Sequence, residues 1–499
     1  MNYSSTLLGV EAHLVGVEVV VTSGLPGLTV VGLPDAAVTE AGARVRSALK
    51  QSGVTLPPRR MVVNLAPADL RKTGSGFDLA LALALSEALD EIPSGCLETT
   101  LVLGELSLDG KVRSVRGEVS SLALAAASEV LDSLMVSAEN ACNLPRWEGV
   151  KVIPVDTLEE ALAYCRGEWS PHSLKHRDAK ATAAELRVPD LAEVQGQALA
   201  KLALEVSAAG GHHLAMVGPP GCGKSFLAAC LPGLLPPMTE SEEREVATIQ
   251  SVCEERFTPG RRPFRAPGCG VSTVALLGGV HPGEVTRAHR GVLFLDEFPE
   301  FRRDALESLR AVLEEGEARV ARARFRIRYP AHFTLVCAMN PCPCGLSGSP
   351  LQTCLCSPSQ IRRYQAKLSG PLADRLDMMV TLDRVSLESA GVSVGESSDR
   401  VAARVERARG VQHERGVLNR DLRGQELFTA LRWSTSDREY AQRIAETSGQ
   451  SMRAYQKWLK VARTLADLGE SMRVERDHLL AARSMRAKET LRSTQGLSA

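Results

Sequence analysis

The fold of this 499-residue chain is decided by the stretch Leu214-Ala215-Met216-Val217-Gly218-Pro219-Pro220-Gly221-Cys222-Gly223-Lys224-Ser225. Four apolar residues, typical of a buried strand, run into the spacing G-x-x-x-x-G-K-[ST] of a phosphate-binding loop, and a helix is expected to begin behind it. Glycines let the backbone N–H groups of such a loop wrap phosphates, and the helix adds its positive end. The stretch therefore predicts a nucleotide site in which Lys224 reaches the β- and γ-phosphates and Ser225 binds Mg²⁺.

Polar residues also follow two other apolar stretches. Residues 291–295 run into Asp296 and Glu297, and residues 333–338 are followed two positions later by Asn340. Strands that alternate with helical segments indicate a parallel α/β sheet, at one edge of which these groups would meet the phosphate loop. We therefore predict that Asp296 holds Mg²⁺, that Glu297 activates the attacking water and that Asn340 orients this water. The alternative is that these residues only form turns.

Charge is segregated along the chain although it sums to zero, with 59 Lys and Arg against 59 Asp and Glu. Residues 1–170 hold 13 basic and 21 acidic side chains, whereas residues 171–499 hold 46 and 38. The neutral sum excludes a uniformly basic nucleic-acid coat, but it leaves room for a local basic surface. With 44% hydrophobic and 24% charged residues the composition excludes a disordered or fibrous chain.

Changes of pattern divide the chain into three domains and a linker. Residues 1–170 mix alternating apolar stretches with Ala- and Leu-rich helical ones, which indicates an α+β domain. Residues 171–188 lack apolar periodicity and are predicted to be a linker. Residues 189–385 hold the α/β core with the phosphate loop. Residues 386–499 are rich in Arg and Ala and poor in strand patterns, as in a helical domain.

We expect a cytoplasmic protein with no part in a membrane. The longest apolar stretch, residues 79–85, is far shorter than the ~18 residues that a membrane span needs. Glu11 and Glu18 interrupt what would be the apolar part of an export signal. The 12 cysteines should then be reduced thiols, and a tight cysteine cluster is more typical of a metal site than of disulfides.

Four of these cysteines form two close pairs in a loop at residues 342–356. They are Cys342, Cys344, Cys354 and Cys356. Four thiolates can bind Zn²⁺ tetrahedrally and pin the loop, in a structural site without an open ligand position. The C-x-C spacing is tighter than the usual C-x₂₋₄-C. Structural Zn²⁺ and four free thiols are therefore both retained as interpretations.

Arginines alternate with apolar residues between positions 320 and 329. On a strand or hairpin this period of two puts four of them on one face, namely Arg322, Arg324, Arg326 and Arg328. A row of guanidinium groups suits a phosphate backbone and reads no base sequence. Aromatic residues make up 4% of the chain, so base stacking is not expected to dominate. The alternative is a solvated strand face whose arginines pair with Glu314, Glu315 and Glu317.

Motifs spread over nearly the whole chain occur together in one known family. In the first domain they are Gly24-Leu25-Pro26-Gly27, Val31-Gly32-Leu33-Pro34-Asp35 and Val63-Asn64-Leu65-Ala66-Pro67-Ala68-Asp69-Leu70. In the core they are Val194-x-Gly196-Gln197, Ala208-Ala209-Gly210-Gly211-His212-His213, the phosphate loop, Arg262-Pro263-Phe264-Arg265-Ala266-Pro267, Pro282-Gly283-Glu284, residues 291–298 and Ser369-Gly370-Pro371-Leu372-x-Asp374-Arg375. Together they resemble the magnesium-chelatase-like AAA+ ATPases of the YifB/ComM family. One departure is Gly268-Cys269-Gly270, where family members usually have two histidines after R-A-P.

The resemblance implies a homo-hexameric ring with ATP and Mg²⁺ bound between subunits. Arg375 would be the finger that enters the neighbouring subunit's site, where its guanidinium neutralises charge in the transition state. Arg453, within Ser451-Met452-Arg453-Ala454-Tyr455, resembles the second sensor and would contact the γ-phosphate. The alternating arginines would lie on a hairpin that projects toward the pore, where six copies would track a nucleic-acid backbone.

The first domain resembles the Lon protease fold, of the ribosomal S5 domain 2-like type. Lon-like peptidases use a Ser–Lys dyad, but the resemblance puts Gly76 at the position of the serine and Val119 at that of the lysine. Neither residue can act as nucleophile or base. Ser75 is one residue away, yet no lysine lies between Lys111 and Lys151. We therefore predict a domain without peptidase activity that serves binding or ring assembly.

The resemblance makes a hexameric ATP-hydrolysing motor on DNA the leading hypothesis. Its activity would be branch migration or helicase action on recombination intermediates, with branched or single-stranded DNA and recombination proteins as partners. The runner-up is a protein-remodelling ATPase of the magnesium-chelatase type that drives a partner subunit, although the ATPase subunit of that enzyme lacks the first domain. A third class, a regulated ATP-binding assembly protein, is disfavoured because both Glu297 and Arg375 are present.

Overall fold

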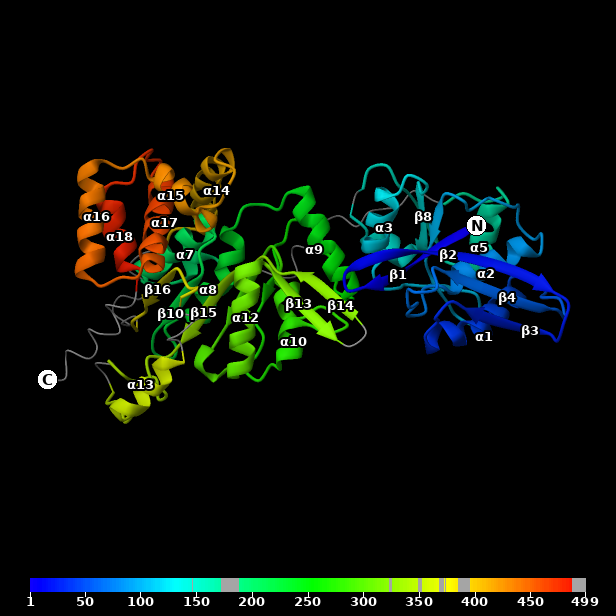
Figure 1. Ribbon diagram of the computed structural model, residues 1–499, viewed down its shortest axis with the longest axis horizontal. Coiled ribbons are helices and arrows are strands. Elements are labelled where there is room, and N and C mark those ends of the chain that lie inside the picture. Colours follow the sequence, from blue (N-terminus) through cyan, green and yellow to red (C-terminus); the bar gives the residue numbers. More distant parts are fainter. Residues whose placement is uncertain are drawn as a thin grey trace. The chain divides into compact units, whose positions relative to one another are not determined.

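The computed structural model describes residues 1–145, 147–171, 188–322, 325–348, 352–367, 372, 374–384 and 395–486. Its contacts form two compact units (Figure 1). The first comprises residues 1–185, 239–259 and 280–282, and the second comprises residues 186–238, 260–279 and 283–499. In the described part of the chain, no helix is long and apolar enough to cross a membrane.

A mixed seven-stranded sheet with the order β3-β4-β2-β1-β5-β8-β9 forms the centre of the first unit. Its strands are β1 (Asn2–Leu8), β2 (Glu11–Thr22), β3 (Gly27–Val31), β4 (Arg60–Ala66), β5 (Thr100–Val102), β8 (Ser133–Ser137) and β9 (Lys151–Val155), and a small hairpin is formed by β6 (Glu105–Leu106) and β7 (Val112–Arg113). The helices of residues 1–171 are α1 (Ala36–Gln51), α2 (Asp78–Ala88), α3 (Glu118–Ala127), α4 (Ala138–Asn143) and α5 (Leu158–Cys165). Pairing is antiparallel for β1 with β2 and for β2 with β4, and parallel elsewhere in this sheet. The α+β prediction is confirmed.

The apolar stretch of the first domain forms a helix that is buried on all sides. Every residue of α2 from Leu79 to Leu85 is buried. A helix that is hydrophobic all round belongs to a core. Asp78 begins it as a fully buried carboxylate that pairs with Arg44 at 2.6 Å. Removing Arg44 would leave an unpaired buried charge, so this pair fixes the way in which α1 packs on α2.

One helix from beyond the linker belongs to the first unit. This helix, α9 (Glu240–Val252), lies in sequence between the phosphate loop and the next strand of the core. Ala247 is fully buried in the apolar cluster around α3, and the Gly117 N–H donates to the Ser251 carbonyl at 3.3 Å. The domain boundary predicted at residue 170 therefore describes the first unit incompletely, because the periodicity of α9 does not reveal on which body its apolar face packs.

The second unit is built on a five-stranded parallel sheet with the order β11-β12-β15-β10-β16. The strands are β10 (Leu214–Val217), β11 (Phe264–Arg265), β12 (Val292–Leu295), β15 (Thr334–Met339) and β16 (Met378–Thr381). Its helical segments are η1 (Leu191–Glu193), α7 (Ala198–Gly210), α8 (Lys224–Leu234), α10 (Thr273–Leu277), α11 (Glu284–Arg287), η2 (Phe298–Glu300), α12 (Arg303–Glu315) and α13 (Pro358–Ala366). The predicted parallel α/β core is confirmed, and the carboxyl ends of β10, β12 and β15 lie at one edge.

The C-terminal part of the second unit is helical, as predicted. It consists of α14 (Ser398–Glu414), η3 (Asn419–Asp421), α15 (Gly424–Leu431), α16 (Thr435–Thr447), α17 (Met452–Leu468) and α18 (Arg476–Ser484), coloured orange to red in Figure 1. Its centre is α17, whose Trp458 is 1% exposed and donates its indole N–H to the Leu479 carbonyl at 2.9 Å. These helices share one apolar cluster with β10, β15 and β16, so the helical part and the core pack as one body.

Candidate nucleotide site and cysteine cluster

The phosphate loop connects β10 to α8 through glycines that the backbone requires. Gly221 and Gly223 have φ of +77° and +91°, in the left-handed region that favours glycine. A Cβ at Gly218 would lie 2.6 Å from the Leu382 carbonyl oxygen. α8 begins at Lys224, directly behind the loop, so its first N–H groups and its positive end face the loop.

Lys224 and Asn340, which were predicted from separate motifs, are in contact. The Lys224 side chain is buried, and its ammonium donates to the carbonyls of Gly218 and Pro219 at 2.6 and 2.9 Å and to Asn340 Oδ1 at 3.2 Å. Three oxygen acceptors compensate the burial of this charge. The pairing of β10 with β15 places Asn340 beside the loop. The core thus brings the lysine and the predicted water-orienting residue to one point.

Ser225 and Asp296 form the second contact of the site. The Ser225 hydroxyl donates to Asp296 Oδ2 at 2.7 Å, and the Glu297 N–H donates to Asp296 Oδ1 at 2.9 Å. A hydroxyl beside a carboxylate is an oxygen donor set of the kind that Mg²⁺ takes in phosphate-binding proteins, so these two residues fit the ion. Glu297 has φ of +50° and an exposed side chain.

A cavity of about 470 Å³ opens next to these residues. Ser225, Asp296 and Glu297 line it together with Gly268 and Cys269. The departure from the family pattern at positions 268–270 therefore faces the nucleotide site. Where the resemblance leads us to expect two histidines, this chain has Gly268 and Cys269.

The structure identifies one contact residue of the loop that was not predicted. Gln197, with φ of +54°, donates its side-chain N–H to the Asp383 carbonyl at 2.6 Å and to the Cys222 carbonyl at 3.4 Å. It thereby joins the phosphate loop to the chain after β16. The sequence motif Val194-x-Gly196-Gln197 includes this residue, but an amide side chain in that motif does not predict a particular role.

Arg375 and Arg453 lie in a second cluster. The Arg375 guanidinium pairs with Glu314 on α12, and Arg310 lies 3.9 Å from the same carboxylate. Burial, and then the positive charges of Arg310 and Arg453, lower the pKa of Arg375. The predicted roles of the two arginines remain predictions, because a finger acts on a neighbouring subunit.

The alternating arginines lie on a hairpin whose geometry differs from the expected one. β13 (Glu317–Arg322) pairs antiparallel with β14 (Phe325–Pro330). Arg326 and Arg328 are exposed, and the exposed Arg319 stands opposite Arg328. Position 322 pairs with 325, whereas Ala321 pairs with Arg326 and Arg319 with Arg328. Because successive strand positions alternate between faces, position 322 falls on the opposite face from Arg326 and Arg328, and the prediction of four arginines on one face is wrong for this position. The side chain of Arg322 and all of Arg324 lie outside the described residues.

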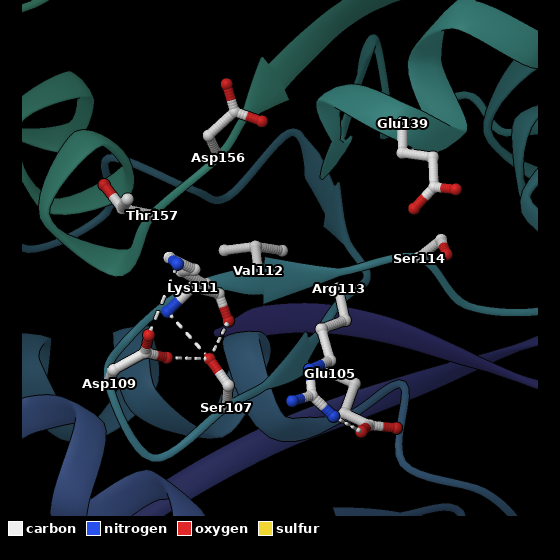
Figure 2. Close-up of a pocket in the computed structure, with 10 residues that line it drawn as sticks. All are labelled: Glu105, Ser107, Asp109, Lys111, Val112, Arg113, Ser114, Glu139, Asp156 and Thr157. Atoms are coloured by element: carbon white, nitrogen blue, oxygen red, sulfur yellow. Dashed lines mark hydrogen bonds and ion pairs between the residues drawn. The ribbon is translucent and has the colours of Figure 1, made fainter.

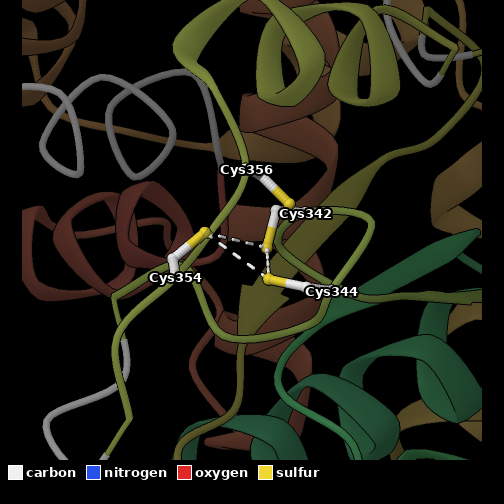
Figure 3. Close-up of side chains that lie close together, drawn as sticks. All are labelled: Cys342, Cys344, Cys354 and Cys356. Carbon is white, nitrogen blue, oxygen red and sulfur yellow. Dashed lines mark hydrogen bonds between the residues drawn. The ribbon is translucent and has the colours of Figure 1, made fainter.

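The four predicted cysteines converge (Figure 3). Their sulfur atoms all lie within 4.8 Å of one another, and Cys342 Sγ is 3.4 Å from Cys344 Sγ and 3.7 Å from Cys354 Sγ. A hydrogen bond from the Leu346 N–H lowers the pKa of Cys344 to about 6. Four convergent sulfurs of this kind fit a tetrahedral Zn²⁺.

The cysteine loop packs directly on the nucleotide site. Cys342 follows Asn340 by two residues, and a Cβ at Gly345 would lie 2.6 Å from Cδ of Pro220 in the phosphate loop. Gly345 also has φ of +78°, so only glycine combines this conformation with this close approach. The cysteine cluster therefore supports the phosphate loop and the segment that holds Asn340.

The predicted positions of a peptidase dyad carry no catalytic pair. A Cβ at Gly76 would meet the apolar side chains of Val115 and Leu103 at 3.7 and 3.8 Å, and Val119 is buried. The neighbouring Ser75 hydroxyl donates to the carboxylate of Glu105. The hydroxyl of Ser75 is thus bound to a carboxylate and not to the amine that a Ser–Lys dyad needs.

A cavity of about 680 Å³ in the first unit has a different chemistry (Figure 2). The Ser107 hydroxyl donates to the Asp109 carboxylate, and the Lys111 ammonium lies 3.5 Å from the same carboxylate. On the same β6–β7 hairpin, Arg113 lies 3.7 Å from Glu105. The lysine side chain is 71% exposed and is paired with Asp109 rather than with a serine.

Three family models match the chain in succession. Residues 17–140 match "Subunit ChlI of Mg-chelatase", residues 190–390 match "Magnesium chelatase, subunit ChlI", and residues 395–486 match "Magnesium chelatase, subunit ChlI C-terminal". The parallel sheet, the phosphate loop and the helical part define an AAA+ protein of the magnesium-chelatase-like class.

Full-length relatives narrow this class. The chain is 39% identical to the uncharacterized protein YifB of Salmonella typhimurium, over 98% of this chain and 97% of that protein. It is 41% identical to an uncharacterized protein of Mycobacterium tuberculosis (97% and 98%) and 39% identical to competence protein ComM of Haemophilus influenzae (97% of each). The chain belongs to the YifB/ComM family of magnesium-chelatase-like proteins.

Proposed function

We propose that this chain is an ATP-hydrolysing motor that assembles as a hexameric ring and translocates on DNA. The observation that supports hydrolysis most strongly is the pair of contacts Lys224–Asn340 and Ser225–Asp296 at one sheet edge, with Glu297 beside them. Three motifs from separate parts of the sequence meet there. The relative named competence protein ComM motivates DNA as the substrate of this motor. We further propose that the motor works in the cytoplasm, with recombination proteins as partners.

Each residue of the site has a role in hydrolysis. Loop N–H groups and Lys224 bind the phosphates of ATP, while Ser225 and Asp296 hold Mg²⁺, which neutralises charge on the phosphate oxygens. Asn340 orients the attacking water, and Glu297 accepts its proton. Arg375 stabilises the transition state in the neighbouring subunit, and Arg453 contacts the γ-phosphate from the helical part.

The hairpin supplies the surface for DNA. Arg319, Arg326 and Arg328 are exposed on β13 and β14, and Arg319 pairs with Glu317 at 2.6 Å. Arg326 and Arg328 are therefore the arginines of this face that we assign to the backbone phosphates. Phosphate contacts bind without base specificity, which suits a motor that moves along any sequence.

Removal of the hairpin charges is expected to weaken DNA binding and to leave ATP binding unchanged. In the variant Arg326→Gln/Arg328→Gln, the slope of log Kobs against log salt should become less steep by about 1 for each phosphate that an arginine no longer neutralises. Fluorescence anisotropy with forked DNA between 50 and 200 mM salt, about the range over which such binding weakens, measures this slope. The matched control is Arg302→Gln/Arg303→Gln, which removes two exposed arginines from the start of α12.

The activity test compares the ATPase rate with and without forked DNA and follows a four-way junction by gel. Stimulation by DNA and ATP-dependent branch migration are expected. Hydrolysis that DNA does not stimulate, together with an unmoved junction, would contradict the DNA motor. That result would favour the alternative, a protein-remodelling ATPase of the magnesium-chelatase type. The first domain does not separate the two, because residues 17–140 match a model described as subunit ChlI of magnesium chelatase.

We further propose that the four cysteines hold a structural Zn²⁺. Metal analysis of the purified chain should find about one Zn²⁺ per chain, and Cys354→Ser/Cys356→Ser should lose it. Because the cysteine loop packs on Pro220, this variant should also bind ATP more weakly. The control Cys142→Ser changes a cysteine of the first unit and should keep the metal. Wild-type protein without Zn²⁺ after expression in zinc-supplemented medium would show that the cluster holds free thiols.

A further inference from the structure

Two consecutive histidines precede the phosphate-loop strand, and both are buried. They follow Gly210 and Gly211 at the end of α7, and His212 and His213 are 0% and 6% exposed. Gly211 has φ of +74°. A Cβ at Gly210 would lie 2.4 Å from the His212 ring and 2.5 Å from Thr464 Oγ1 of α17. The absence of a side chain at Gly210 thus allows the imidazole of His212 to contact Thr464 of the helical part.

His213 connects three strands of the sheet. Its ring Nδ1 accepts the Leu335 N–H of β15 at 3.0 Å. Its own N–H donates to Asp377 Oδ2 at 2.9 Å, and its carbonyl accepts the N–H groups of Asp377 and Met378 at 3.0 and 3.1 Å. Burial lowers the pKa of His213 to about 3, so the ring is neutral and its Nδ1 can accept. One residue directly before β10 therefore ties β15, the strand that precedes Asn340, to β16.

His212 and Asp377 extend this connection to the helical part. His212 Nε2 lies 2.8 Å from Thr464 Oγ1, and its Nδ1 lies 3.7 Å from Asp377 Oδ2. The Asp377 side chain is 5% exposed, and Lys457 of α17 places its ammonium 3.5 Å from it and 2.9 Å from the Leu376 carbonyl. Burial disfavours ionisation of Asp377, but the neighbouring His212 ring and the charge of Lys457 outweigh it and lower the pKa of Asp377.

The two residues of this ion pair, Asp377 and Lys457, each lie close in sequence to an arginine with a predicted role in ATP hydrolysis. Asp377 follows Arg375 by two residues, and Lys457 lies one helical turn after Arg453 on α17. Residues four apart lie on the same face of a helix. Arg453 and Lys457, which pairs with Asp377, therefore share one face of α17. A shift of α17 relative to β16 would therefore change the position of Arg453 relative to Arg375. The same shift would strain the contact of His212 with Thr464 and the ion pair of Lys457 with Asp377.

We propose that His212, His213, Asp377 and Lys457 form a coupling element that positions Arg375 and Arg453 for ATP hydrolysis. None of the four side chains contacts the phosphate loop in the described part of the chain, so they are positioning residues rather than catalytic ones. The inference rests on the proposed ATPase function. According to this inference, the buried ion pair of Asp377 and Lys457 transmits the change from bound ATP to ADP from β10 and β15 to the helical part.

Replacement of Lys457 by methionine tests the coupling, because methionine keeps most of the length and loses the charge. We expect kcat for ATP hydrolysis to fall about 10- to 100-fold, since small displacements of positioned groups cost this much. The KM for ATP should stay within about twofold, because the phosphate loop and Lys224 are untouched. The matched control is Arg404→Met, which removes another ion pair between the helical part and α7, at 2.6 Å from Glu205, and should leave kcat unchanged.

The double variant Asp377→Asn/Lys457→Met separates coupling from mere stability. Removal of one partner leaves a buried charge unpaired and should lower the melting temperature, whereas removal of both can restore it. A coupling role predicts that the double variant regains stability but not kcat. Recovery of kcat together with stability, or a folded Lys457→Met variant with wild-type kcat, would refute the inference. A wild-type protein without ATPase activity would refute the proposed function itself, and the inference with it.

Discussion

The variant Glu297→Gln is expected to bind ATP like the wild type and to lose about 10²- to 10⁴-fold in ATPase kcat. Glutamine has the size of glutamate, but its amide cannot accept the proton of the attacking water. The exposed side chain of Glu297 lines the cavity beside Asp296, so the exchange leaves the core intact. Steady-state hydrolysis measures kcat, and a fluorescent ATP analogue measures affinity.

The matched control for this exchange is Glu300→Gln. Glu300 is the next acid along the chain and is also exposed, but it does not line the cavity. It should keep wild-type kcat. If Glu297→Gln turns over ATP at the wild-type rate, Glu297 is not the general base and the role assigned to it has to be given up.

The variant Arg375→Ala is expected to lose about 10³-fold or more in kcat, the usual contribution of an arginine finger. In the single chain the Arg375 guanidinium is held by Glu314 rather than exposed to solvent. A finger acts across a subunit interface, so the fall in activity should depend on the neighbouring subunit. Arg303→Ala on the same helix α12 as Glu314 serves as the control and should remain active.

A mixing experiment shows whether Arg375 acts on the neighbouring subunit. Arg375→Ala and Glu297→Gln chains are each expected to be inactive alone. Because a head-to-tail ring pairs each site with the next subunit, a random equal mixture should complete about a quarter of the sites with an intact Glu297 and an intact Arg375. If the mixture hydrolyses ATP no faster than the separate variants, Arg375 either acts on the site of its own subunit or only stabilises the fold of that subunit.

The nucleotide site could be predicted from the sequence because its chemistry is local. The phosphate loop, the acids after β12 and Asn340 after β15 each follow an apolar strand, and parallel strands bring their carboxyl ends to one edge. The contact between Lys224 and Asn340 follows from this topology. The convergence of the four cysteines could also be predicted, because residues so close in the sequence can meet within one loop, whatever the rest of the fold.

Other features depend on information that a pattern of residues does not contain. The alternation of arginines covers positions on both β13 and β14, so it does not show which positions pair in the hairpin. The amphipathic pattern of α9 predicts a helix but not the body on which it packs. His212 and His213 have no spacing typical of a site, and only the fold shows that they meet Asp377 and Thr464.

The place of α9 also determines the order in which the chain can fold during synthesis. When a ribosome has completed residues 1–171, the first unit still lacks Ala247, which fills the apolar cluster with Leu101 and Val119. This cluster closes only after the phosphate loop and α8 have also emerged. Part of the interior of the nascent first unit therefore stays open to water until synthesis has passed residue 247 of the 499.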